Sequence, residues 1–185
     1  MGSVAKNGLN NYVKQLLEHP LRTKVITAGV MLGINDIVSQ KLTGIQKIQF
    51  KRLFLKVFIG AAYFGPFGHY FQILLEKIFK GKKDSKTVTK KVLIDQLISS
   101  PLNNLIFMFY YGLVIEGQPW MHVKASVKKA FPSVQYASWM FGSAIGLINY
   151  KFIPLHFRVV FNSLIALCWG VFMNLRARSM ALTKP

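Results

Sequence analysis

Five apolar runs, separated by stretches rich in lysine and arginine, dominate this sequence of 185 residues. They cover about residues 25–41, 57–75, 97–115, 134–150 and 159–175. Apolar runs close to the roughly 20 residues that span a bilayer, with basic residues between them, are typical of polytopic membrane proteins. Hydrophobic residues make up 52% of the chain and charged residues only 16%, against about 25% in soluble domains. We therefore predict an all-α integral membrane protein with one domain over residues 1–185.

The charge balance narrows the class of protein further. Lysine and arginine total 24 residues against 6 acidic residues, a formal net charge of +18. A soluble nucleic-acid-binding protein could carry this excess, but here the basic residues lie between apolar runs. We therefore expect a lipid bilayer, and no nucleic acid, as the partner. The basic residues divide more unevenly between the two sides with four crossings than with five, and the positive-inside bias favours four. The last two runs would then form one broken unit.

Two patterns refine the predicted architecture. An apolar stripe at helical spacing precedes the first run and consists of Leu9, Tyr12, Val13, Leu16 and Leu17. It predicts an amphipathic N-terminal helix at the membrane surface. The motifs QLLEHPL (15–21) and QLISSPL (96–102) share one pattern, which suggests a two-plus-two helix repeat like those of small transport proteins. The expected fold is a bundle of four transmembrane helices preceded by this amphipathic helix.

Glycine and proline residues interrupt several of the runs. They mark expected helix breaks or close packing and comprise Gly29, Gly33, Gly65, Pro66, Gly142, Gly146 and Pro154. Gly29 and Gly33 form a G-x-x-x-G pair, which lets a second helix approach closely, although chance explains such a pair equally well. Pro66 removes a backbone hydrogen bond, which usually kinks a helix.

A few polar residues fall at or near the expected membrane depth, namely Asp36, His69, Asp95, Gln96, Asn149 and Arg158. Charged side chains there cost about 2.5–3.5 kcal/mol each on insertion scales, so they need partners or water. We expect Arg158 to pair with Asp36 or Asp95. Two interpretations stay open: the group lines a polar seam or pore, or the two aspartates lie at the interface and cap helices.

The most basic stretch runs from Glu76 to Lys91. Its candidate targeting residues are Lys80, Lys82, Lys83, Lys86, Lys90 and Lys91. We interpret the stretch as a solvated loop that a membrane surface or a receptor could recognise. An ordinary loop on the positive side of the membrane is the simpler alternative.

Motifs for catalysis are absent from the sequence. The four histidines lack metal-ligand spacing, and the single cysteine, Cys168, lies in an apolar run. The chain has no nucleophile-elbow, Walker or dinucleotide-binding motif. We therefore expect no enzyme activity, no metal and no cofactor.

An ordered set of residues extends over nearly the whole chain. It begins with HPLRTKVITAGV (19–30) and Asp36-x-x-x-Gln40, and continues with Gly65-Pro66, His69, Asp95-Gln96, Pro101, Asn149-Tyr150, Pro154, Arg158 and Trp169. This set resembles the 22-kilodalton peroxisomal membrane protein family, which includes a mitochondrial inner-membrane branch. The stretch NYKFIPLHFR (149–158) looks most like the plant peroxisomal members. Ser143 stands where the family usually has a proline, so the sequence departs from the family pattern at the kink expected there.

The resemblance implies a peroxisomal membrane protein with four crossings that acts as a channel or permeability factor for small solutes. It also implies that a cytosolic import receptor recognises basic stretches beside the spans. The alternatives are a non-conducting structural or assembly protein of the membrane and a channel of the mitochondrial inner membrane. A homo-oligomer is compatible with the sequence.

Overall fold

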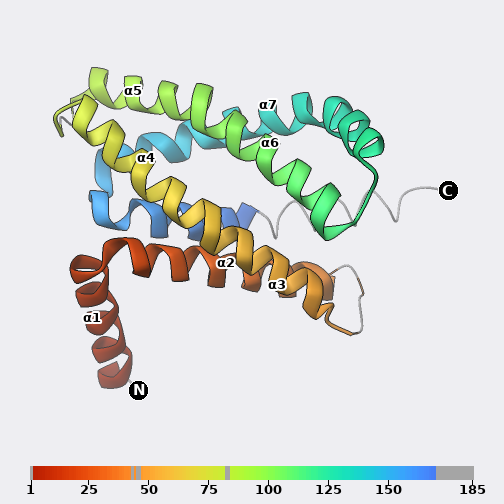
Figure 1. Cartoon of the computed structure of the whole chain (residues 1–185). Helices are drawn as coiled ribbons and strands as arrows, with labels where there is room; N and C mark the ends of the chain where they lie inside the picture. Colours follow the sequence, from red (N-terminus) through yellow and green to blue (C-terminus); the bar gives the residue numbers. More distant parts are fainter. Residues whose placement is uncertain (1, 43, 45–46, 82–83, 170–185) are drawn as a thin grey trace. The chain divides into compact units, whose positions relative to one another are not determined.

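The computed structural model describes residues 2–42, 44, 47–81 and 84–169, and this part of the chain is helical without a strand (Figure 1). The α-helices are α1 (Gly2–Glu18), α2 (Pro20–Leu42), α3 (Phe50–Ile59), α4 (Gly65–Ile78), α5 (Ser85–Ile94), α6 (Ser100–Tyr110) and α7 (Trp120–Phe152). The shorter elements are the π-helical turns η1 (Gly60–Phe64), η2 (Asp95–Ser99) and η3 (Tyr111–Ile115) and the 3-10 turn η4 (Leu155–Phe157). η4 opens an apolar helical segment, Leu155–Trp169. The predicted all-α class is confirmed.

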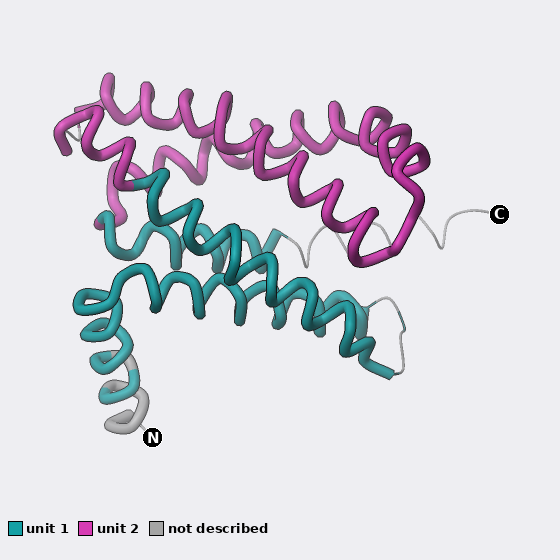
Figure 2. Tube along the Cα trace, in the orientation of Figure 1, with its two compact units in different colours: residues 1–72, 155–185 teal, residues 73–154 magenta. Residues whose placement is uncertain are grey.

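The chain divides into two compact units, coloured separately in Figure 2. Unit 1 comprises residues 1–72 and 155–185, and unit 2 comprises residues 73–154. In unit 1, α2 packs against α1, α3 and η1. In unit 2, α7 packs against α5, η2 and α6. The predicted single membrane domain stays a prediction.

Each of the two long helical stretches, 50–78 and 85–115, contains a π-helical turn shortly before a proline. The amide of Gly65 donates to the Gly60 carbonyl, and the amide of Ser100 donates to the Asp95 carbonyl. Each of these amides directly precedes a proline, Pro66 or Pro101. Proline has no N–H and its ring crowds the preceding turn, so a widened turn lets the helix continue.

The burial pattern is inverted relative to a soluble protein. Among the described residues, fifteen polar or charged side chains are buried, against ten apolar ones. On α2 the side chains of Ile26, Val30 and Ile34 are exposed, while Lys24 and Asp36 are buried. Soluble proteins bury apolar side chains and almost never bury Lys or Asp completely. The inversion is what helices need when the surrounding solvent is hydrocarbon.

Length and apolar composition single out one helical stretch within the described residues as a candidate membrane span. This is Ser85–Ile115, a run of 31 residues from α5 to η3, whose most apolar part is almost entirely unburied. Leu155–Trp169 is a shorter apolar helix, and residues 170–175 of the last apolar run lie outside the described residues. The count of four crossings and the internal repeat stay predictions.

The stretch from Glu76 to Lys91, predicted to be a solvated loop, is a loop only in its middle, because α4 continues to Ile78 and α5 begins at Ser85. The side chain of Asp84 accepts a hydrogen bond from the Thr87 amide at 3.1 Å, and this N-cap starts α5 at Ser85. Lys91 lies on the inner face of α5, where it is fully buried and its Nζ is 3.0 Å from Glu76 Oε1. Helical spacing places Lys91 on the same buried face of α5 as Val88 and Val92.

The C-terminal break lies where the sequence places it. α7 ends at Phe152, and Ile153 is extended with φ −88° and ψ 126°. A residue before proline is disfavoured in the helical conformation, so Pro154 enforces this end. Pro132 lies inside α7, which begins at Trp120; α7 therefore extends well before the run 134–150.

Candidate functional site

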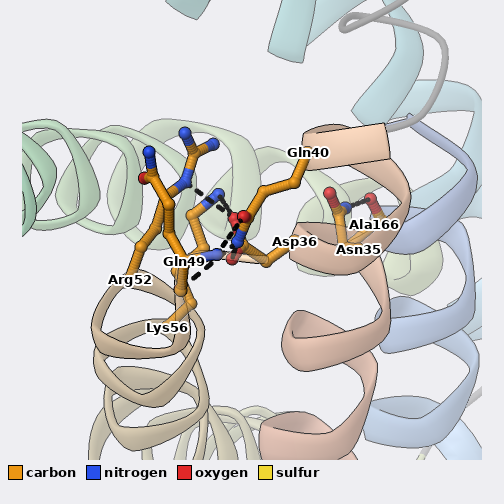
Figure 3. Close-up of polar contacts among 7 residues, drawn as sticks. All are labelled: Asn35, Asp36, Gln40, Gln49, Arg52, Lys56 and Ala166. Carbon is orange, nitrogen blue, oxygen red and sulfur yellow. Dashed lines mark hydrogen bonds and ion pairs between the residues drawn. The ribbon is translucent and has the colours of Figure 1, made fainter. Parts of the chain in front are cut away.

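A buried carboxylate, Asp36, lies at the centre of a polar cluster between α2 and α3 (Figure 3). Its Oδ1 is 2.9 Å from Arg52 Nε and 2.8 Å from Lys56 Nζ. Gln40 Nε2 donates to Asp36 Oδ2 at 2.6 Å, and the Gln49 amide donates to Gln40 Oε1 at 2.6 Å. We call these five residues the Asp36 cluster. The side chains of Asp36, Lys56 and Arg52 are 0%, 9% and 20% exposed, so only Arg52 has appreciable access to solvent.

Helical spacing explains why these side chains meet. Asp36 and Gln40 are four residues apart on α2, and Arg52 and Lys56 are four residues apart on α3, so each pair shares one helix face. Glycine brings the two faces together: a Cβ on Gly33 would lie only 2.9 Å from Val57 Cγ2. The close approach lets the short Asp36 side chain reach both cations.

The Asp36 cluster joins two helices and keeps one positive charge in excess. Because Asp36 already accepts from Gln40, Arg52 and Lys56, most of its acceptor capacity is used. Asp36 lies well inside α2 and does not act as its cap. The arrangement therefore fixes α2 against α3.

The predicted pairing of Arg158 with Asp36 is wrong. Among the described residues the charged partners of Asp36 are Arg52 and Lys56, because α3 packs against this face of α2. Asp95 belongs to unit 2, where it begins the π-helical turn η2. Its pairing with Arg158 stays a prediction.

A second buried group in unit 1 is cationic. Lys24 Nζ lies 3.2 Å from His69 Nδ1, and Arg158 is close enough to Lys24 for Coulombic repulsion. Lys24 and Arg158 are each 1% exposed, and His69 is buried as well. The structure thus brings together two predicted residues, His69 and Arg158, with a lysine that the prediction missed.

Unit 2 contains a neutral polar network between α6 and α7. Asn104 Nδ2 donates to Gln135 Oε1 and to Ser138 Oγ, each at 3.0 Å, and Gln135 Nε2 donates to Ser100 Oγ at 3.1 Å. These four residues, the Asn104 network, were not predicted. They lie on the inner faces of these helices, and exposed residues such as Tyr136 and Met140 lie on the outer face of α7.

The remaining predicted seam residues of unit 2 lie on the same inner faces. The Gln96 carbonyl accepts from Trp139 Nε1 at 2.8 Å, and a Cβ on Gly142 would lie 2.7 Å from Gln96 Oε1. Asn149 is 2% exposed within α7, and Gly146 faces Val92. Gln96 and Gly142, both predicted, are therefore in contact.

The predicted targeting lysines fall into three classes. Lys80, Lys86 and Lys90 are exposed, Lys91 is buried, and Lys82 and Lys83 lie outside the described residues. Within the part of the chain that the structure describes, no three His, Cys, Asp or Glu side chains are grouped as metal ligands would be. Cys168 is exposed.

The chain is similar to known membrane proteins over nearly all of its length. The model of the Mpv17 / PMP22 family matches residues 113–174. A peroxisomal membrane protein, PMP22, of Arabidopsis thaliana is 56% identical over 177 residues, which cover 96% of this chain and 93% of the relative. Peroxisomal membrane protein 2 of Bos taurus is 26% identical and covers 94% of this chain and 91% of its own length.

The mitochondrial inner membrane protein Mpv17 of Rattus norvegicus is 27% identical, with 91% of this chain and 97% of the relative covered. No solved structure matches the fold. With more than half of its residues identical to a peroxisomal membrane protein over nearly its whole length, the chain belongs to the Mpv17/PMP22 family and, as predicted, is a protein of the peroxisomal membrane.

Proposed function

We propose that the protein is a channel or permeability factor for small solutes in the peroxisomal membrane. The inverted burial pattern carries this proposal: polar and charged side chains lie inside each unit, and large apolar side chains lie outside. Charged groups at membrane depth are costly and usually mark a path for ions or solutes.

Buried oxygen atoms support a hydrated interior. Among the described residues, Tyr63 Oη, Gln96 Oε1 and Asn103 Oδ1 are buried without a hydrogen-bond partner in the protein. Buried polar groups nearly always have a protein or water partner, so these oxygens favour water in the interior. A hydrated polar interior is what a solute path requires.

The proposed channel has four crossings in two helix pairs. The first pair is α2 with the helix 50–78, and the second is the helix 85–115 with α7, followed by Leu155–Trp169 as the last part of a broken unit. Support comes from the long apolar stretch Ser85–Ile115 and from the exposed apolar face of α2. Each unit also holds one pair of contacting long helices, as a two-plus-two repeat would.

Leak from proteoliposomes tests the channel directly. Purified full-length protein should release a trapped small solute faster than protein-free liposomes do. Gln96→Leu removes a buried polar side chain and should slow the release several-fold. Leu97→Ala changes the adjacent exposed residue and should leave the release unchanged. Sealed liposomes that hold folded protein and show no leak would refute the proposal.

A non-conducting structural or assembly protein is the second candidate. The Asp36 cluster favours it, because its hydrogen bonds and ion pairs hold α2 against α3 without requiring a solute path. In that case, substitutions in the Asp36 cluster would lower stability while the leak of every variant stays at the protein-free level.

We also propose that a cytosolic import receptor recognises the exposed lysines Lys80, Lys86 and Lys90, which lie just before α5 and within it. Replacing Lys80, Lys86 and Lys90 together by glutamine should remove a fluorescent fusion from peroxisomes. A control that replaces Lys124, Lys128 and Lys129, also exposed, should keep the peroxisomal signal. Equal loss or equal retention in both variants would contradict the assignment. Self-association is a further proposal, which cross-linking in intact peroxisomes would test.

A further inference from the structure

Three helical segments of unit 1 bring buried basic side chains to one place. Lys24 comes from α2, His69 from α4 and Arg158 from Leu155–Trp169, and we call them the Lys24 cluster. Lys24 Nζ lies 3.2 Å from His69 Nδ1. Coulombic repulsion from Arg158 acts on Lys24, and His69 is subject to repulsion from Lys24 and His156. The cluster is therefore a concentration of positive charge inside the protein.

Glycine residues on α4 make this convergence possible. A Cβ on Gly65 would lie 2.7 Å from Val25 Cα, and a Cβ on Gly68 would lie 3.5 Å from Val159 Cγ2. Val25 follows Lys24 in the chain, and Val159 follows Arg158. α4 thus lies close to both neighbouring segments beside the two cations, and Lys24 and Arg158 are each only 1% exposed.

Acidic residues of the same unit do not neutralise Lys24. Residues 1–72 and 155–185 contain two acidic side chains, Glu18 and Asp36. Asp36 is held by Arg52 and Lys56, and Glu18 is half exposed and lies 3.9 Å from Lys14. Within the described residues the hydrogen-bond partner of Lys24 is His69. A lysine ammonium has three N–H donors, so two remain to be satisfied.

A buried ammonium group is expensive unless it is paired, and a second cation nearby raises the cost. Both penalties disappear when an anion lies against the cluster. We propose that the Lys24 cluster binds a small oxyanion, a phosphate or carboxylate group, inside unit 1. Lys24 donates to it as a point charge, and the positive charge of Arg158 nearby favours an anion at this place. The site does not depend on whether the protein conducts.

Thermal stability measures this binding, because a ligand that binds only the folded state raises the melting temperature. Purified full-length protein in detergent is titrated with inorganic phosphate against chloride at equal ionic strength. We expect a saturating rise in the melting temperature. Lys24→Gln should abolish the rise, and Lys24→Arg should retain it. Lys14→Gln, at an exposed site, is the matched control and should respond as the native protein does.

A second arm separates a dissolved anion from a lipid headgroup. Delipidated protein is supplied with phosphatidic acid or with phosphatidylcholine, and retained lipid is counted by native mass spectrometry. A response to inorganic phosphate assigns the site to a dissolved anion, and a response to phosphatidic acid alone assigns it to a headgroup. Either response supports the proposal if the Lys24→Gln variant no longer shows that response.

Equal responses of the native protein and of folded Lys24→Gln in both arms would overturn the oxyanion site. If Lys24→Gln does not fold, direct binding to the native protein decides. Equilibrium dialysis with labelled phosphate should then show about one site per chain that phosphatidic acid competes for. Absence of both phosphate binding and retained phosphatidic acid would refute the site.

Discussion

Replacing Asp36 by asparagine would remove the negative charge between Arg52 and Lys56 while keeping the size of the side chain. Lys56 is 9% exposed and would be left as a buried cation without its carboxylate, whereas Arg52, at 20%, can turn partly to solvent. Breaking a buried ion pair by removing one partner costs about 3–5 kcal/mol. A neutral hydrogen bond between membrane helices averages only about 0.6 kcal/mol. We expect Asp36→Asn to lower the free energy of unfolding by about 3 kcal/mol, the lower end of the ion-pair range.

The assay is reversible unfolding in mixed micelles, followed by circular dichroism. Adding Lys56→Met to Asp36→Asn removes the uncompensated cation and should recover more than half of the loss. Asn35→Ala is the matched control, because Asn35 is the neighbouring residue and its hydrogen bond to the Ala166 carbonyl, at 3.3 Å, is exposed. This substitution should lower the free energy of unfolding by less than about 1 kcal/mol. The reasoning fails if Asp36→Asn unfolds within 1 kcal/mol of the native protein, or if Lys56→Met brings no recovery, on the scale set by buried pairs.

Two further substitutions test packing and burial by the same unfolding measurement. Gly33→Leu should lower the free energy of unfolding by about 1–3 kcal/mol through overpacking, because the new Cβ would lie 2.9 Å from Val57 Cγ2. Gly8 on α1 faces open space, so Gly8→Leu should leave the free energy of unfolding unchanged or raise it by up to about 1 kcal/mol. Lys91→Met should cost about 2 kcal/mol or more through loss of its buried ion pair, and Lys90→Met, at an exposed site, should stay within about 0.5 kcal/mol. Equal effects within either pair would contradict the burial on which the prediction rests.

The sequence predicts the helical class and several breaks because these depend on local chemistry. The apolar runs, Pro154 and the Gly65-Pro66 step each act within a few residues of chain. The start of α7 at Trp120 was harder to predict, because three lysines and Pro132 make residues 116–132 resemble a loop. Val123 and Val127, four residues apart and buried, are the helical signal in that stretch.

The partner of Asp36 was not predictable in the same way. Arg52 and Lys56 looked like part of a basic loop before the second apolar run, and their i, i+4 spacing alone does not say which helix they face. The match with Asp36 and Gln40, also at i, i+4, is the signal that could have found the cluster. The spacing alone does not show that α2 and α3 pack against each other. That packing depends on the close contact between Gly33 and Val57.

The Asp36 cluster and the Asn104 network bury polar groups by different means, and this has an energetic consequence. The Asp36 cluster contains ion pairs, while the Asn104 network consists of amides and hydroxyls. Removing one partner from a charged group leaves an uncompensated ion at about 3–5 kcal/mol, whereas a neutral interhelical bond contributes about 0.6 kcal/mol. Most single substitutions in the Asn104 network should therefore be tolerated. Substitutions that remove one partner from an ion pair of the Asp36 cluster should not, because they leave a buried charge without its counter-ion.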